Sequence, residues 1–191
     1  MLVYLVRRNM NRIIPLLLFF IISSCSSVPL STIVRMSTFD AQDFAALNPD
    51  ELRVKVTLPK GFELDAELSW LGIDINSPAG QHHGVFTLNQ ESVQSETTSA
   101  GFFSEPEQVV IYRLSLSSSS RVKFSDLQQF ISKATAEDIA IRVVPKLASY
   151  PPDATSVKVS VDLLLYQSQG FLTLVDAARL PLGKLAQSEE N

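Results

Sequence analysis

Two neighbouring stretches of the chain alternate between apolar and polar residues, and this period of two constrains the fold more than any other feature. In "RVKVTLP", residues 53–59, the apolar positions are Val54, Val56 and Leu58. In "FELDAELSW", residues 62–70, they are Leu64, Ala66, Leu68 and Trp70. Such alternation is typical of strands that cover a core with one face and meet water with the other. Both stretches therefore predict β-structure.

The link between the two stretches, Pro59-Lys60-Gly61, has the composition of a turn. Pairing the strands about Lys60 places opposite charges together on the wet face and apolar residues together on the dry face. The pairs would be Arg53 with Glu67, Lys55 with Asp65, Val54 with Ala66, and Val56 with Leu64. The sequence thus predicts an antiparallel hairpin. After Trp70 the inward phase passes to Leu71, Ile73 and Ile75, and Gly72 is the natural place for a bulge.

Further strands are expected in "EQVVIYRLSLS" and in a second hairpin near the end of the chain, where Val157 to Leu165 and "FLTLVDAARL" flank "QSQG". Between them the period becomes helical, and Ser125 with Gln128 forms a capping-box pattern. One amphipathic helix is expected at about 125–136. About seven strands, one helix and no βαβ rhythm predict a mainly β fold, an antiparallel β-sandwich-like domain.

The chain opens with a basic segment and a short apolar run. Arg7, Arg8 and Arg12 precede "IIPLLLFFII", residues 13–22. This run is about half the ~20 residues that a helix needs to cross a bilayer. Basic residues, a short apolar segment and then small residues indicate an export signal. Met10 is an alternative start, and the segment that follows it still holds Arg12.

The signal ends at Ile22-Ser23-Ser24-Cys25, which holds the only cysteine of the chain. This stretch resembles the lipobox of bacterial lipoprotein precursors, although Leu is commoner at the first position and Gly or Ala at the third. The resemblance implies that Cys25 receives a diacylglycerol, that cleavage precedes it, and that the new amino terminus is acylated. At about 0.8 kcal/mol for each buried CH₂, several acyl chains make a firm anchor in the bilayer. Ser26, in place of an aspartate, implies the outer membrane, facing the periplasm, rather than the inner membrane.

These segments divide the chain into four parts. Residues 1–24 are the expected lipoprotein signal peptide, and residues 25–36 the lipidated cysteine with a tether. Residues 37–184 form a single mainly β domain, a length within the usual range for one domain. Residues 185–191 are a solvated tail.

Charge and composition exclude several classes of function. Without residues 1–24 the chain has 13 basic and 20 acidic residues, which argues against nucleic acid as a partner. No CxxC or Cys/His spacing indicates a metal site, and no glycine-rich phosphate loop indicates a cofactor. We therefore expect neither a metal nor a cofactor.

Local signals for catalysis are weak. His82 and His83 are the only histidines, and we expect them in an exposed loop. Carboxylates share strand faces in Glu63/Asp65/Glu67 and in Glu105/Glu107, an arrangement that acid/base catalysis could use. The basic residues predicted opposite the first set explain it as a solvated face. The chain contains no GxSxG motif. We predict no enzymatic activity.

Two adjacent phenylalanines, Phe102 and Phe103 in "AGFFSEPE", cannot both face inward on a strand, and they are the candidate contact with a partner. The leading prediction is an accessory or assembly subunit that binds another envelope protein, with strand addition as one mode of contact. One alternative, a carrier of an apolar ligand or lipid, predicts a cavity lined by residues such as Trp70 and Phe102. The other, a cell-envelope hydrolase, predicts His82 or His83 beside a serine or an acid.

Overall fold

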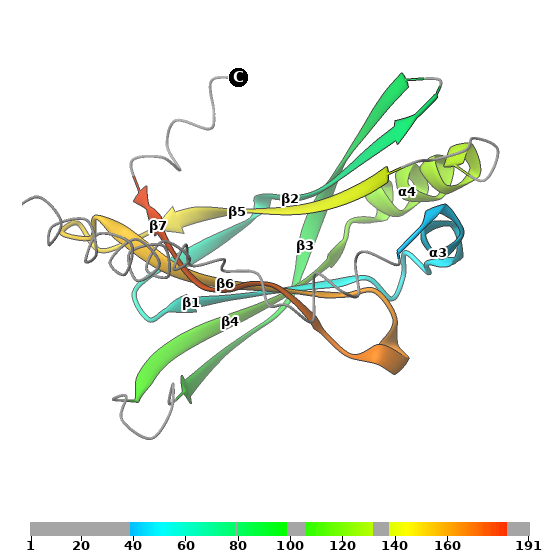
Figure 1. Ribbon diagram of the computed structural model, residues 1–191. Coiled ribbons are helices and arrows are strands. Elements are labelled where there is room, and N and C mark those ends of the chain that lie inside the picture. Colours follow the sequence, from blue (N-terminus) through cyan, green and yellow to red (C-terminus); the bar gives the residue numbers. More distant parts are fainter. Residues whose placement is uncertain (1–38, 79, 99–105, 132–137, 183–191) are drawn as a thin grey trace, which may run out of the picture.

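The computed structural model describes residues 39–78, 80–98, 106–131 and 138–182, which form a mainly β, antiparallel fold (Figure 1). The expected signal, tether and tail lie outside these ranges. The strands are β1 Arg53–Pro59, β2 Glu63–Ser77, β3 Gly80–Thr98, β4 Glu107–Leu116, β5 Asp138–Ser149, β6 Ser156–Leu164 and β7 Leu172–Pro181. The helices are α3 Ala41–Ala46 and α4 Ser118–Ile131, with a 3₁₀ turn at Gln167–Gln169.

A single curled sheet runs in the order β5-β2-β3-β4-β1-β6-β7. β3 belongs to both halves of it, because residues 80–87 pair with β2 and residues 88–98 pair with β4. β2 and β5 therefore form one layer, and β4, β1, β6 and β7 form the other (Figure 1). β5 and β7 do not pair within the described residues, so the curled sheet stays open. The predicted sandwich-like, mainly β fold is confirmed.

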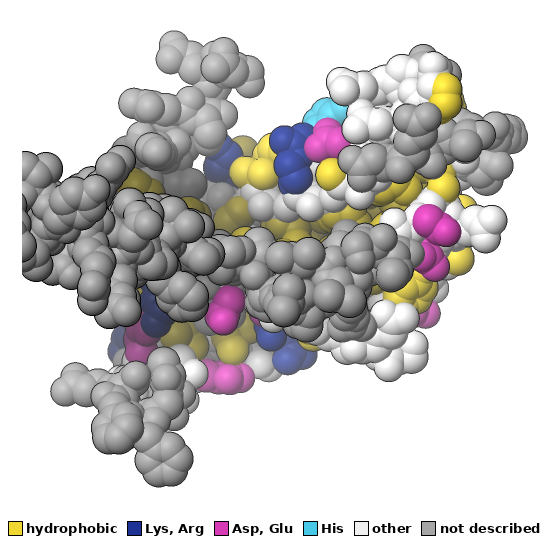
Figure 2. Space-filling model, viewed as in Figure 1, with side chains coloured by type: hydrophobic (Ala, Val, Ile, Leu, Met, Phe, Trp, Pro, Cys, Tyr) yellow, Lys and Arg dark blue, Asp and Glu magenta, His cyan; other side chains and the backbone are white. Residues whose placement is uncertain are grey.

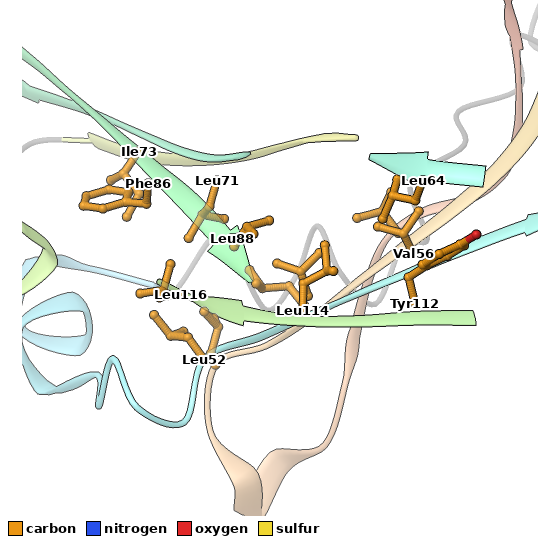
Figure 3. Close-up of a cluster of buried hydrophobic side chains, with 14 of the residues drawn as sticks. Leu52, Val56, Leu64, Leu71, Ile73, Phe86, Leu88, Tyr112, Leu114 and Leu116 are labelled. Carbon is orange, nitrogen blue, oxygen red and sulfur yellow. The ribbon is translucent and has the colours of Figure 1, made fainter. Parts of the chain in front are cut away.

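The core lies between the two layers. Leu71 and Ile73 of β2 point toward Leu114 and Leu116 of β4 (Figure 3). Phe124 of α4 closes one end of the core, with its ring centroid 4.9 Å from that of Phe44 and 5.3 Å from that of Phe86. The small gap beside these residues holds no volume that a water molecule could occupy. Around Phe124, the described side chains therefore fill the space between the layers.

The predicted hairpin of residues 53–59 with residues 62–70 is wrong. β1 lies between β4 and β6, whereas β2 lies between β3 and β5. Residues 59–61 do form a turn, in which Phe62 N donates to Pro59 O over 3.2 Å, with Gly61 at φ 94°. This turn carries the chain from one layer to the other.

The charged residues of β1 consequently have other partners than predicted. Arg53 Nε lies 2.7 Å from Glu91 Oε2, and Lys55 Nζ lies 3.2 Å from Asp162 Oδ2. The predicted apolar face of β1 is confirmed, because Val54, Val56 and Leu58 are at most 2% exposed. Alternation thus gave the face of the strand correctly but not its neighbour.

In β2, the positions that face the core shift by one residue before Trp70 rather than at Gly72 as predicted. The pairing of β2 with β5 is irregular there, between Asp65 and Trp70. There Ser69 is buried, and its hydroxyl donates to Asp65 O and accepts from Lys146 N. Leu68, predicted inward, is 61% exposed, and Trp70 lies on the outer face. Gly72 is not the bulge. The predicted inward positions Leu71, Ile73 and Ile75 are confirmed, each at most 2% exposed.

The one longer helix, α4, begins at Ser118, upstream of the predicted start near Ser125. Ser117 caps it, because its Oγ accepts from Ser120 N over 3.2 Å. Gln128, predicted to complete a capping box, instead donates through Nε2 to the carbonyls of Phe44 (2.9 Å) and Leu47 (2.8 Å) and so joins the two helices. Residues 132–136 of the predicted helix lie outside the described residues.

The second predicted hairpin is confirmed by the antiparallel pairing of β6 with β7. No helix within the described ranges has the length and apolar character required to span a membrane.

Candidate functional site

The edges of the curled sheet are the first candidate, because edge strands present unpaired N–H and C=O groups that can bind another strand. Within the described ranges, β5 and β7 are open along one side. Among the described strands, residues 88–98 of β3 pair only with β4, so they form a third edge.

Two of these edges are irregular. In β7, Asp176 and Ala177 together lie opposite Ser160, which makes a bulge. In the outer half of β3, the pairing with β4 shifts at Glu91, whose carboxylate binds Arg53. Bulges and charged side chains are features that hinder the pairing of an edge with a foreign strand. β7 and the outer half of β3 are therefore protected.

The edge of β5 is different. Its first seven residues, 138–144, pair with β2 in one unbroken register. Ile139, Ile141 and Val143 pack against the core and yet remain partly exposed. This segment, residues 138–144, is called the β5 edge below. It combines an apolar row of side chains with backbone groups that no other described strand pairs.

Pro145 marks the end of the β5 edge. The N–H of Lys146 points to β2, where it donates to Ser69 Oγ over 2.9 Å. Because successive residues of a strand point their N–H groups to opposite sides, the nitrogen of Pro145 faces the open side. Proline is tolerated at that position of an edge strand. Pro145, the last residue of "IAIRVVP", is thus a sequence signal for an edge strand. The alternation of apolar residues alone did not indicate that edge.

A polar cluster lies on the outer face beside the β5 edge. Arg142 Nε lies 2.8 Å from Asp74 Oδ2, and His83 Nδ1 lies 2.5 Å from Asp74 Oδ1. The guanidinium of Arg142 also lies 5.9 Å from the ring centroid of Trp70. Figure 2 shows a histidine, an acidic and a basic side chain gathered there, beside hydrophobic side chains.

The structure separates the two histidines, which lie in β3 and not in the predicted loop. His83 lies on the outer face beside Asp74. The hydrolase alternative predicted such a contact between one of the histidines and an acid. His82 points to the opposite face, where its ring lies 4.2 Å from that of Phe130 and its Nε2 has no hydrogen-bond partner within the described ranges. No hydroxyl group among the described residues hydrogen-bonds to His83.

The candidate carboxylates do not converge. Asp65 Oδ1 accepts from Leu68 N in the irregular part of β2, and Glu63 and Glu67 are exposed. Glu107 pairs with Lys158 across 2.7 Å. No group of three potential metal ligands is present in the part of the chain that the structure describes.

Three predicted site residues, Cys25, Phe102 and Phe103, lie outside the described residues, as does Glu105. Trp70 is described, and its position on the outer face does not match the predicted lining of an internal cavity. No known protein-family model, curated protein or solved structure matches this chain.

Proposed function

We propose that this protein is a bacterial envelope lipoprotein, anchored through acylated Cys25, that serves as a non-catalytic accessory or assembly subunit and binds another envelope protein. The observation that carries this proposal is the β5 edge, which is regular and apolar and has no partner strand on its outer side among the described residues. The lipobox-like stretch that ends at Cys25 supports the anchor.

The partner would add an extended segment to the β5 edge. Main-chain hydrogen bonds provide affinity in this mode, and alternate side chains provide specificity. Apolar side chains of the added strand would cover Ile139, Ile141 and Val143, which are only partly buried. Its outward side chains would lie beside Arg142, whose guanidinium is held by Asp74.

Two observations favour this function over the alternatives. The gap that Leu71, Phe124 and Leu163 line between the layers has no room for even a water molecule, which favours protein binding over carriage of an apolar ligand. The His83–Asp74 pair lies on a strand face, and none of the grooves found in the described part of the chain is lined by either residue. A hydrolase needs a cleft in which such groups meet a substrate.

We place the domain at the outer membrane, facing the periplasm, because Ser26 follows the cysteine. Residues 25–36, if fully extended, would span about 40 Å. The partner would then be a protein at or near the same membrane.

Incorporation of a labelled fatty acid tests the anchor, and Cys25→Ala should abolish it. In-cell crosslinking of the full chain tests the partner. We expect a discrete adduct with wild type that Ala140→Lys removes, because a lysine on an edge strand opposes strand addition. Ser149→Lys adds the same charge to β5 beyond Pro145 and should keep the adduct. An adduct that survives Ala140→Lys would exclude the β5 edge, and the absence of any adduct would contradict the proposed function.

A further inference from the structure

The β5 edge offers its hydrogen-bonding groups to the open side at alternate residues only. The N–H of Lys146 points to β2, where it donates to Ser69 Oγ. Because the N–H and C=O groups of successive residues point to opposite sides of a strand, Ile139, Ile141 and Val143 direct theirs to the open side. No other described strand pairs with them there. A strand that docks on the β5 edge must therefore bond to these three residues.

Pro145 ends this set of bonding residues. Its nitrogen faces the open side and carries no hydrogen, so it cannot donate to a docked strand. Ile141 thus lies at the centre of the set, with Ile139 two residues before it and Val143 two residues after it. All three side chains are β-branched and pack against the core. The bonding groups and the apolar row of the β5 edge are therefore symmetric about Ile141.

A symmetric edge is complementary to a second copy of itself that runs antiparallel. Residues that lie directly opposite each other at bonding positions exchange both main-chain hydrogen bonds. With Ile141 opposite Ile141 of the second copy, Ile139 lies opposite Val143 of that copy, and the reverse pair follows from the two-fold axis. Every open N–H and C=O group of the three residues then has a partner, and no bond requires Pro145.

The two neighbouring registers are worse. A register must shift by two residues if the apolar row is to keep its face. One such shift places Arg142 opposite Arg142 of the second copy, where like charges repel, and Ile139 opposite Pro145, which lacks the N–H. The other shift places Val143 opposite residue 137, which precedes β5. Only the register centred on Ile141 uses the whole set.

The outer face of β5 fits the same register. Arg142 lies opposite Ala140 of the second copy, whose side chain is a single methyl group. The guanidinium of Arg142 donates to Asp74 Oδ2 over 2.8 Å and lies 5.9 Å from the ring centroid of Trp70. It therefore leans over β2, with its charge compensated, and leaves room for the second copy.

We propose that two copies of this protein pair through their β5 edges, with the two-fold axis at Ile141, when no other strand occupies the edge. Copies anchored in one membrane through Cys25 would meet at a raised local concentration. The pair would cover both apolar rows, and an envelope partner would have to displace one copy. The inference rests on the function proposed for the β5 edge and adds what regulates that edge.

Disulfide formation in cells between two differently tagged full-length copies tests the pairing, because Cys25 is the only native cysteine. One copy carries Ala140→Cys and the other Arg142→Cys. These residues would lie directly opposite at a non-bonded position, with about 4.5 Å between Cα atoms, within the range of a disulfide. The control pair replaces Ala140→Cys by Ala148→Cys, an exposed position of β5 beyond Pro145. In the proposed register it lies about 27 Å from the second cysteine, and we expect at least about tenfold less disulfide.

Equal disulfide yields in the two pairs would overturn the proposal, since they would indicate random collision, and so would the absence of disulfide in both. A disulfide between two copies that both carry Ala140→Cys would place the axis at Ala140 and overturn the register. The mass of the adduct separates this test from that of the proposed function, because a disulfide adduct contains two copies of this chain and a partner adduct contains another protein. Loss of the first adduct alone overturns the inference, and loss of the second alone overturns the proposed function.

Sedimentation equilibrium of the full chain in a non-ionic detergent tests the pairing without a change at Arg142. Wild type should sediment as a dimer. Ala140→Lys should sediment as a monomer, because the new lysine lies opposite Arg142 of the second copy. Ala148→Lys adds the same charge outside the β5 edge and should remain a dimer. A monomeric wild type, or a dimer that Ala140→Lys leaves intact, would overturn the proposal.

Discussion

The indole ring of Trp70 lies across Gly72, two residues further along β2. A Cβ atom added at Gly72 would be 2.6 Å from Cζ3 of that ring. Arg142, which pairs with Gly72 from β5, places its guanidinium over the same ring. Glycine is therefore needed here because the ring occupies the space of a side chain, and the ring in turn covers backbone that glycine leaves bare.

Replacing Gly72 by alanine should lower the free energy of unfolding by about 1–3 kcal/mol, the usual cost of overpacking. Urea unfolding of the purified protein measures this change. In a Trp70→Ala background the same substitution should cost nothing, because the clashing ring is absent. Equal costs in both backgrounds would show that the contact with the ring is not the cause.

Phe124 has the most enclosed position on α4, with no exposed surface and rings of Phe44 and Phe86 beside it. Phe124→Ala should lower the free energy of unfolding by about 3–5 kcal/mol, since it removes a buried ring and leaves a cavity. Val122→Ala on the same helix, at a side chain that is 63% exposed, should change it by less than about 0.5 kcal/mol. A similar effect of both substitutions would mean that α4 does not pack on the core as described.

The sequence predicted the faces of strands well and their neighbours poorly. Alternation placed Val54, Val56 and Leu58 in the core correctly, because burial of one face depends only on local period. The charge pairs of the predicted hairpin were locally consistent, but Lys55 finds an equally suitable acid in Asp162, more than a hundred positions away. Short-range rules of pairing cannot choose between such partners.

Tertiary contacts also decided the other differences. Ser69 is buried because its hydroxyl bonds to backbone groups on two strands, whereas a pattern of hydrophobicity favours Leu68 at the core. The start of α4 lies in a run of serines that resembles a loop until Ser117 is recognised as its cap. For the candidate site, Pro145 was the one local sign of an edge strand.

The observed register predicts energetic coupling between Lys55 and Asp162. Asp162 is 8% exposed and also accepts from Thr173 Oγ1 over 2.6 Å, so its carboxylate is held in place. A double-mutant cycle with Lys55→Ala and Asp162→Ala should give a coupling of about 1 kcal/mol in the free energy of unfolding. The matching cycle with Asp65→Ala should give less than about 0.3 kcal/mol. A coupling energy of Lys55 with Asp65 that exceeds its coupling with Asp162 would instead support the predicted pairing of residues 53–59 with residues 62–70.

Tyr166 makes stability sensitive to alkaline pH. Its hydroxyl donates to Asp43 O over 3.0 Å. Burial, and then the negative charges of Asp43 and Asp40, raise the pKa of this phenol above its ordinary value of 10.0. The folded state therefore favours the neutral phenol, so this contribution is complete below the unfolded pKa and is lost as the pH rises through the folded pKa.

Urea unfolding at about pH 8 and about pH 11 measures this dependence. Tyr166→Phe should lose less stability than wild type over that interval, because it has no phenol to ionise. The same loss in both proteins would assign the alkaline sensitivity to other groups.

The left-handed conformation of Ala177 predicts a substitution that stabilises the protein. For an alanine this conformation costs about 1–2 kcal/mol, whereas glycine adopts it freely and loses about 0.5–1 kcal/mol in chain entropy. Ala177→Gly, at φ 48°, should therefore raise the free energy of unfolding by about 0.5–1 kcal/mol. Ala178→Gly, one residue further in β7, carries only the entropic cost and should lower the free energy of unfolding by about 0.5–1 kcal/mol. Equal destabilisation by the two substitutions would show that the bulge opposite Ser160 does not hold Ala177 in this conformation.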